Sequence, residues 1–248
     1  MPTFKDYFST QSSDYSKYRP DYPQELYDFI LSEVKECKTA WDCGTGNGQA
    51  AAVLSQYVEK VYATDPSAEQ IKNATQKSNI EYRVASAENS TLPDKSVDLI
   101  TVAQALHWFD FTKFFAEVKR VAKPDAIIAV WSYELCKVDE ETDKIFIKFY
   151  RDILEDYWAP ERKHVENAYS SIPFPFTEVK ENVFYMKKQW NLQDFMGYLS
   201  TWSAVQKYIK TNGANPLELV ATNFQKAWIN PTAVKEVSFP ITVKTGRI

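Results

Sequence analysis

Three glycines at alternating positions, Gly44, Gly46 and Gly48, interrupt the stretch AWDCGTGNGQAA. Residues 39–43, which lead into them, are typical of a short buried strand, and residues 48–57 carry apolar side chains at helical spacing. A glycine turn between a strand and a helix begins the βαβ unit, in which nucleotide-like cofactors bind. Glycine permits either unusual backbone angles or the close approach of a ligand, so this stretch alone predicts a tight turn or a ligand site.

Strands and helices alternate over the first half of the chain. Further strands are expected at 60–65, 80–86, 97–103 and 126–132, and helices at 23–34, 67–77 and 110–122. Such alternation predicts a parallel sheet with right-handed crossovers. Ser67 is the expected N-cap of its helix.

Helices and aromatic residues dominate the second half. Helices are expected at 143–158 and 192–209, and strands at 179–189 and 236–245. Five of the seven tryptophans lie after position 130. We expect the helical segments to form an aromatic-rich cap with an apolar pocket for a small ligand, although the same side chains would also suit an ordinary core.

The length of 248 residues suits one α/β domain. We expect this single domain to consist of an N-terminal lid and lead-in helix at 1–36, a cofactor-binding core at 37–133, helical cap insertions at 134–178 and 190–232, and late strands at 179–189 and 236–245.

The composition argues against several partners. The net charge is −4 and the Lys and Arg residues are dispersed, so we do not expect the protein to bind nucleic acid. No apolar run is long enough to cross a membrane and the start does not resemble a signal peptide, so a cytoplasmic protein is expected. Three cysteines without CxxC spacing predict neither structural disulfides nor a metal site. The oligomeric state does not follow from the sequence.

The glycine spacing distinguishes between cofactors. A nicotinamide fingerprint is G-x-G-x-x-G, whereas here the third glycine comes one position early. Asp42, directly before the turn, would repel a pyrophosphate. S-adenosylmethionine carries a sulfonium and an ammonium group and no phosphate, so it fits better, and its carboxylate can use free N–H groups at the start of the helix.

Polar residues follow the next three strands at the same edge of the sheet, where open α/β sheets bind ligands. Asp65 ends the second strand, where a carboxylate can accept hydrogen bonds from both ribose hydroxyls of either cofactor. Ala87 and Glu88 follow the third strand, where Glu88 can accept a hydrogen bond from an adenine amino group. The residues after the fourth strand are Gln104, Ala105, Leu106, His107 and Trp108.

The motifs WDCGTGNG, ATDPS, ASAENSTLPDKSVDLITVAQALHWFD and RVAKPDAIIAVW resemble, in this order, those of class I S-adenosylmethionine-dependent methyltransferases. The segments YSKYRPDYP, HWFDFTKFF and YLSTWSAVQKY resemble more specifically the group that contains trans-aconitate methyltransferases. The resemblance spans nearly the whole chain. It implies a Rossmann-like, seven-stranded, mostly parallel sheet whose last strand is antiparallel.

The resemblance also implies roles for individual residues. Asp42, Gly44 and Gly46 would hold the methionine end of the cofactor, Asp65 the ribose, Ala87 and Glu88 the adenine, and Gln104 and Ala105 the sulfonium. In relatives the N-terminal segment folds over the cofactor, so Tyr18 and Arg19 would close the site. Arg19 could pair with a carboxylate of cofactor or substrate, or it could belong to a solvated lead-in.

The expected reaction is methyl transfer to a small-molecule acceptor, for which a carboxylate is one candidate. A carboxylate needs no general base, whereas a hydroxyl or phenol would use one, and His107 is the candidate, with a structural role as the alternative. His164, in the charged stretch ERKHVEN, is expected at the surface. Trp108 and Trp202 are candidates for the acceptor wall or lid. A non-catalytic cofactor-binding module and a nicotinamide-dependent oxidoreductase are the competing functions.

Overall fold

Seven strands form one sheet in the computed structural model, which describes residues 21–248. The strands are β1 (Thr39–Cys43), β2 (Lys60–Asp65), β3 (Ile80–Val84), β4 (Val97–Ala103), β5 (Ala122–Tyr133), β6 (Thr177–Trp190) and β7 (Lys235–Arg247). Their order in the sheet is β3-β2-β1-β4-β5-β7-β6. The first five are mutually parallel, and β7 is antiparallel to both β5 and β6. The Rossmann-like sheet with an antiparallel last strand is therefore confirmed.

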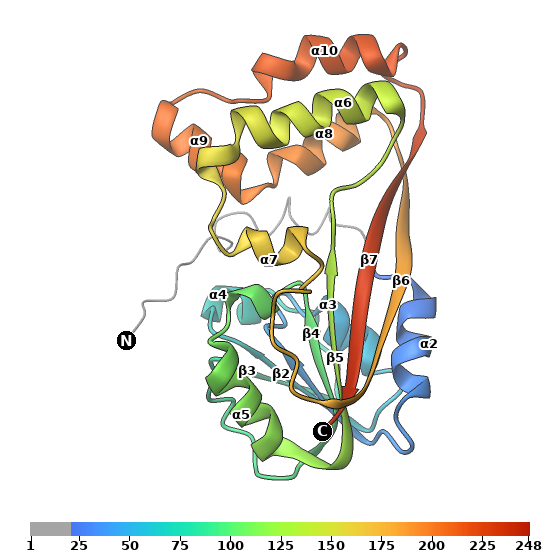
Figure 1. The fold of residues 1–248 in the computed structure, drawn as a ribbon, viewed down its shortest axis with the longest axis vertical. Coiled ribbons are helices and arrows are strands. Elements are labelled where there is room, and N and C mark those ends of the chain that lie inside the picture. Colours follow the sequence, from blue (N-terminus) through green and yellow to red (C-terminus); the bar gives the residue numbers. More distant parts are fainter. Residues whose placement is uncertain (1–20) are drawn as a thin grey trace.

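The helices divide between the sheet and a cap. They are α2 (Gln24–Ser32), α3 (Gln49–Leu54), α4 (Ala68–Lys72), α5 (Phe111–Val121), α6 (Glu140–Lys148), α7 (Arg162–Glu166), α8 (Leu192–Ser200), α9 (Ser203–Asn212) and α10 (Glu218–Trp228). In Figure 1, α6, α8, α9 and α10 gather at one end of the molecule, and α7 lies between them and the sheet. We call α6 to α10, with the turns between them, the cap.

Strand β5 explains why both faces of the sheet are covered. Successive side chains of a strand point to opposite faces. Ile127, Ala129 and Trp131 join the buried cluster that contains α2 and α3, whereas Ile128 and Val130 join the cluster that contains α5. A central parallel strand buried on both sides needs this continuous apolar run.

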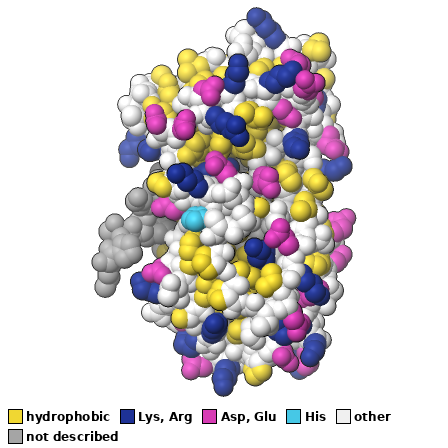
Figure 2. Space-filling model, viewed as in Figure 1, with side chains coloured by type: hydrophobic (Ala, Val, Ile, Leu, Met, Phe, Trp, Pro, Cys, Tyr) yellow, Lys and Arg dark blue, Asp and Glu magenta, His cyan; other side chains and the backbone are white. Residues whose placement is uncertain are grey.

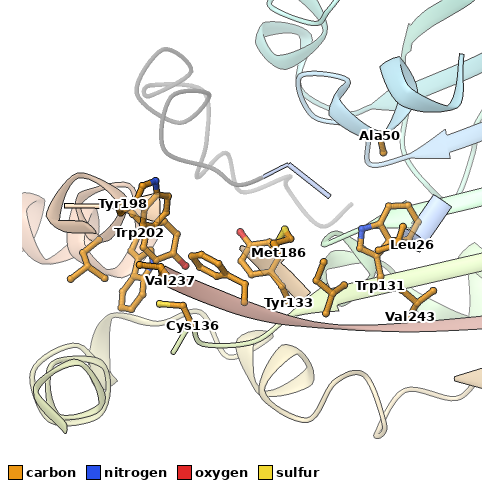
Figure 3. Packing of buried hydrophobic residues seen from close by; sticks show 14 of the residues in the cluster. Leu26, Ala50, Trp131, Tyr133, Cys136, Met186, Tyr198, Trp202, Val237 and Val243 are labelled. Atoms are coloured by element: carbon orange, nitrogen blue, oxygen red, sulfur yellow. The ribbon is translucent and has the colours of Figure 1, made fainter. Parts of the chain in front are cut away.

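The core on the first face continues without a break from the sheet into the cap. Figure 3 shows a row of buried side chains that runs from Leu26, Trp131 and Val243 to Tyr198 and Trp202. β6 leads directly into α8, which begins with a capping box between Asn191 and Asp194. The sheet and the cap therefore share one hydrophobic core.

Several predicted helices differ from those observed. Helix 67–77 ends at Lys72, although Ser67 caps it as predicted by accepting a hydrogen bond from the Gln70 N–H at 3.3 Å. The segment predicted as one helix at 192–209 forms α8 and α9, because Trp202 adopts an extended backbone that directs its ring into the cap core. The segment at 143–158 is helical only as far as Ile153, in a π-helical turn, and then forms a short 3-10 helix.

We expect the cap and the sheet to unfold in a single transition, because they share this core. Leu199→Ala removes a fully buried side chain of α8 and should cost about 2–5 kcal/mol of the free energy of unfolding. Leu219→Ala in α10, where the side chain is 61% exposed, is the matched control and should cost under about 0.5 kcal/mol. Urea unfolding followed by far-UV circular dichroism and by tryptophan fluorescence should give coincident midpoints. Separate midpoints for the two signals would contradict a shared core.

Candidate active site

The three glycines of the turn meet three different surroundings. All have a positive φ, of 69° at Gly44, 55° at Gly46 and 83° at Gly48. A Cβ at Gly44 would lie 2.6 Å from the Cβ of Ala105, and one at Gly48 would lie 2.2 Å from the hydroxyl oxygen of Tyr82. A Cβ at Gly46 would meet no described atom within 4 Å. Two glycines therefore allow close packing of the chain on itself, and the middle one borders space that residues 21–248 leave open.

Asp42 and Asp65 place two carboxylates at this turn in different environments. The Asp42 carboxylate is fully buried and accepts hydrogen bonds from the hydroxyls of Thr45 and Thr101. Burial raises its pKa to about 6 despite these bonds. The Asp65 carboxylate accepts the N–H of Gly46 at 2.9 Å and that of Ser67 at 2.8 Å, so it ties the glycine turn to the end of β2.

The predicted adenine-side residues lie in the loop after β3. Ala87 is buried, and the Glu88 carboxylate accepts a hydrogen bond from the Asp110 N–H at 2.9 Å. This bond joins the loop to the N-terminus of α5, where Asp110 is the N-cap. Glu88 is thereby held at the carboxyl edge of the sheet.

Gln104 directly follows β4 in a left-handed conformation, with φ of 53°. Its side-chain oxygen accepts the Tyr133 N–H at 2.8 Å, which joins the ends of β4 and β5. Ala105 follows it and packs against Gly44. The loops after β1 and β4 are thus in direct contact at the edge where the sequence placed a ligand.

A cavity of about 70 Å³ opens beside these loops and extends under the cap. On this measure one water needs roughly 10–15 Å³, so the cavity has room for a small organic group. Its lining residues are Gln104, His107, Trp108, Tyr133, Trp158, Ala159, Arg162, Tyr198, Trp202 and Ser203. The predicted aromatic-rich pocket is therefore present, and Trp108 and Trp202 both line it.

His107 lies in a short 3-10 helix, Leu106–Trp108, directly after β4, and its side chain is buried. Its Nδ1 lies 2.9 Å from the hydroxyl oxygen of Tyr169. Burial, with the positive charge of Arg162 nearby, lowers the pKa of His107 to about 3. The imidazole is therefore neutral at neutral pH and too weakly basic for efficient general-base catalysis, which argues against that role.

The structure brings most of the predicted site residues to one edge of the sheet. Tyr18 and Arg19 lie outside the described residues. Cys43 is buried, and burial raises its pKa well above the ordinary value, so it remains a thiol. His164, expected at the surface, is partly buried, with its Nδ1 2.9 Å from the Ser171 hydroxyl.

Comparisons with known proteins agree with this geometry. Residues 41–130 match the family described as a methyltransferase domain. A protein of Dictyostelium discoideum that is assigned as a methyltransferase is 36% identical over 245 residues, covering 96% of this chain and 93% of that protein. This chain belongs to the class I S-adenosylmethionine-dependent methyltransferases.

Two further similarities extend over different parts of this methyltransferase. A solved structure assigned as a type II methyltransferase from Anaeromyxobacter dehalogenans is 40% identical, with a TM-score of 0.86, and covers 93% of this chain and 98% of that one. A Saccharomyces cerevisiae protein assigned as an S-adenosylmethionine-dependent methyltransferase is 30% identical over 132 residues, 50% of this chain and 45% of that protein. The similarity to the bacterial structure includes the cap.

Sequence reasoning missed several residues in and around the methyltransferase's cavity. Trp158 and Arg162 line it, and Tyr169 contacts the lining residue His107. All three come from the segment after α6, whose charged residues suggested a surface position. Ala168 and Tyr169 both have a positive φ, of 47° and 60°, and this turn carries the Tyr169 ring to His107. A tyrosine within such a turn gives no recognisable sequence signal.

One face of the methyltransferase mixes positive and negative side chains. On the face drawn in Figure 2, Lys and Arg side chains are scattered among Asp and Glu side chains. Among residues 21–248, no helix is both long and apolar enough to cross a membrane.

We expect acid to destabilise the methyltransferase partly through His107. The folded pKa of about 3 lies below the ordinary value of 6.5, so the unfolded chain binds more protons between these values and stability falls as the pH drops through 6.5. At pH 5 this linkage is worth about 2 kcal/mol. The loss of unfolding free energy between pH 7.5 and 5 should therefore be about 2 kcal/mol smaller in His107→Asn than in the wild type.

Urea unfolding at the two pH values measures this difference. Asn keeps a neutral hydrogen-bonding group near the Tyr169 hydroxyl. The same acid sensitivity in His107→Asn and in the wild type would show that His107 titrates normally.

Proposed function

We propose that this protein transfers the methyl group of S-adenosylmethionine to a small acidic molecule bound in the cavity beside β4. The observation that carries the proposal is the position of the cavity. It begins at Gln104 and His107, which follow the strand where this family places the sulfonium, and it ends under the aromatic cap. A ligand in this cavity would therefore face the methyl group.

The residues at the glycine turn fit such a cofactor. Gly46 borders open space, and the Asp65 carboxylate lies next to it. A carboxylate has about four lone-pair sites, so a group such as Asp65, which accepts the Gly46 and Ser67 N–H groups, is of a kind that can also accept ribose hydroxyl hydrogens. Two acidic groups at the turn, Asp42 and Asp65, favour a cationic ligand and disfavour a pyrophosphate.

The individual contacts of the cofactor are part of the proposal. Asp42, Gly44 and Gly46 would hold the methionine end, Asp65 the ribose, Ala87 and Glu88 the adenine, and Gln104 and Ala105 the sulfonium. Asp42 is fully buried, so it would act on the methionine end through Thr45 and the backbone of the turn.

The cofactor supplies a methyl group that the sulfonium already activates towards displacement. The protein then needs to orient the acceptor and exclude water, and orientation can supply roughly 7–11 kcal/mol of barrier lowering. Trp158 and Trp202, with ring centres 5.3 Å apart, form an aromatic wall of the cavity that would limit the access of water to a bound acceptor. A carboxylate acceptor is already a nucleophile and forms a methyl ester without giving up a proton, which is consistent with the neutral, weakly basic His107.

The choice of an acidic small molecule also rests on resemblance. The segments YSKYRPDYP, HWFDFTKFF and YLSTWSAVQKY resemble the trans-aconitate methyltransferase group. A net charge of −4 gives no long-range attraction for nucleic acid. A cytoplasmic location remains a prediction from the sequence.

Binding of S-adenosylhomocysteine should depend on the open space at Gly46. Gly46→Val would fill this space, so we expect it to abolish binding measured by calorimetry while the protein stays folded. Gly213→Val at the end of α9 is the matched control, because Gly213 has a similar φ of 68° and also no neighbour within 4 Å of an added Cβ. The control carries the same backbone strain and should bind normally.

Two outcomes would change this assignment. Equal binding by the Gly46 and Gly213 variants would move the cofactor away from the turn. Binding of a dinucleotide by the wild type, without binding of S-adenosylhomocysteine, would favour an oxidoreductase.

The acceptor class can be tested directly with methyl-labelled cofactor. Purified protein is incubated with separate pools of small metabolites, RNA and protein, and we expect the label to enter the metabolite pool in a base-labile form, as a methyl ester. Heat-denatured enzyme is the control. Label mainly in RNA or protein would overturn the small-molecule proposal, and no transfer to any pool, despite cofactor binding, would favour a non-catalytic module.

A further inference from the structure

One charged side chain, Arg162, lies among the described residues that line the cavity. The other lining residues are aromatic, small or neutral, and His107 is kept neutral by burial. No Asp or Glu of residues 21–248 contributes to the lining. The charge that residues 21–248 supply to the cavity wall is therefore positive, although the whole chain is acidic.

The guanidinium of Arg162 is fixed in orientation by its neighbours. Its Nε donates a hydrogen bond to the Tyr150 hydroxyl at 3.1 Å, and its Cζ lies 5.0 Å from the ring centre of Trp158 and 5.6 Å from that of Tyr150. The Tyr150 hydroxyl in turn donates its hydrogen to Glu166. These contacts involve Nε and the flat face of the guanidinium, and they leave its outer end, Nη1 and Nη2, unused.

That outer end has free hydrogen-bonding capacity. Within residues 21–248, Arg162 forms no ion pair, and its Nη1 and Nη2 have no hydrogen-bond partner. A guanidinium with two adjacent unused nitrogens matches the two oxygens of a carboxylate. Glu166 does not satisfy it directly, because the Tyr150 hydroxyl lies between them.

The surroundings favour an anion over a cation as the guest. Aromatic walls can also bind ammonium groups through cation–π contacts. Here Arg162 already occupies the face of Trp158, and a second cation in the same small space would be repelled. A neutral acceptor would leave the guanidinium unpaired in a partly desolvated cavity, which is unfavourable.

We propose that Arg162 is the acceptor-binding cation of this enzyme, with a carboxylate of the acceptor on its Nη1 and Nη2 and the acceptor body against Trp158 and Trp202. The inference rests on the proposed function and names the residue that selects the substrate class. It assigns to the cap the role that the sequence suggested first for Arg19. Tyr150 is a positioning residue, since its hydroxyl accepts the hydrogen bond of Nε and thereby holds the guanidinium in one orientation.

The test uses full-length protein, methyl-labelled cofactor and a panel of mono-, di- and tricarboxylates that includes trans-aconitate, each paired with its neutral amide. We expect acids to be methylated and the amides not. Arg162→Met should raise the KM for the best acid by about 10- to 150-fold, the effect of losing a charged hydrogen-bonded pair, and should leave the affinity for S-adenosylhomocysteine unchanged. Arg162→Lys, which keeps the charge without the planar fork, should give an intermediate KM.

Arg151→Met is the matched control, because Arg151 belongs to the same part of the cap and is exposed outside the cavity. It should leave KM unchanged. The inference is wrong if the Arg162 variants bind cofactor and retain the wild-type KM for the acid, or if the enzyme binds cofactor and methylates only acceptors without an anionic group. Absence of cofactor binding in the wild type would instead reject the proposed function itself.

Discussion

The contact between Gly44 and Ala105 sets the geometry on which the site depends. The loop after β1 packs so closely on the loop after β4 that a Cβ added at Gly44 would lie 2.6 Å from the Cβ of Ala105. Gly46, two residues after Gly44, has no described neighbour within 4 Å of an added Cβ, and Gln104, directly before Ala105, lines the cavity. Methyl transfer needs its donor and acceptor within van der Waals distance. Because the loops after β1 and β4 touch, a cofactor at the first loop and an acceptor at the second can lie that close.

The sequence could predict what local patterns determine. The strand, the glycine turn and the helix that follow one another at residues 39–57 need only apolar spacing and glycine, and Ser67 caps its helix through neighbours three residues away. The antiparallel last strand could be predicted only through resemblance to a family, because the partner of β7 lies far away in the chain.

Features that depend on distant partners could not be predicted from the sequence. Which glycine borders open space depends on Tyr82 in β3 and on Ala105 in the loop after β4. The low pKa of His107 depends on burial by the segment that carries Tyr169. Arg162 lies in a charged stretch typical of an exposed helix, and only the packing of Trp158 and Tyr150 directs it to the cavity.

The long pairing of β6 with β7 has a consequence for motion. Their ladder runs from Thr177 opposite Arg247 to Trp190 opposite Lys235. At the cap end of this ladder, β6 leads into α8, and β7 follows α10 after a short loop. Figure 1 shows these two strands spanning the distance from the sheet to the cap. A hinge motion of the cap against the sheet would have to bend this ladder as a unit, whereas movement of the segment between β5 and β6, where the π-helical turn and α7 lie, would leave it unchanged.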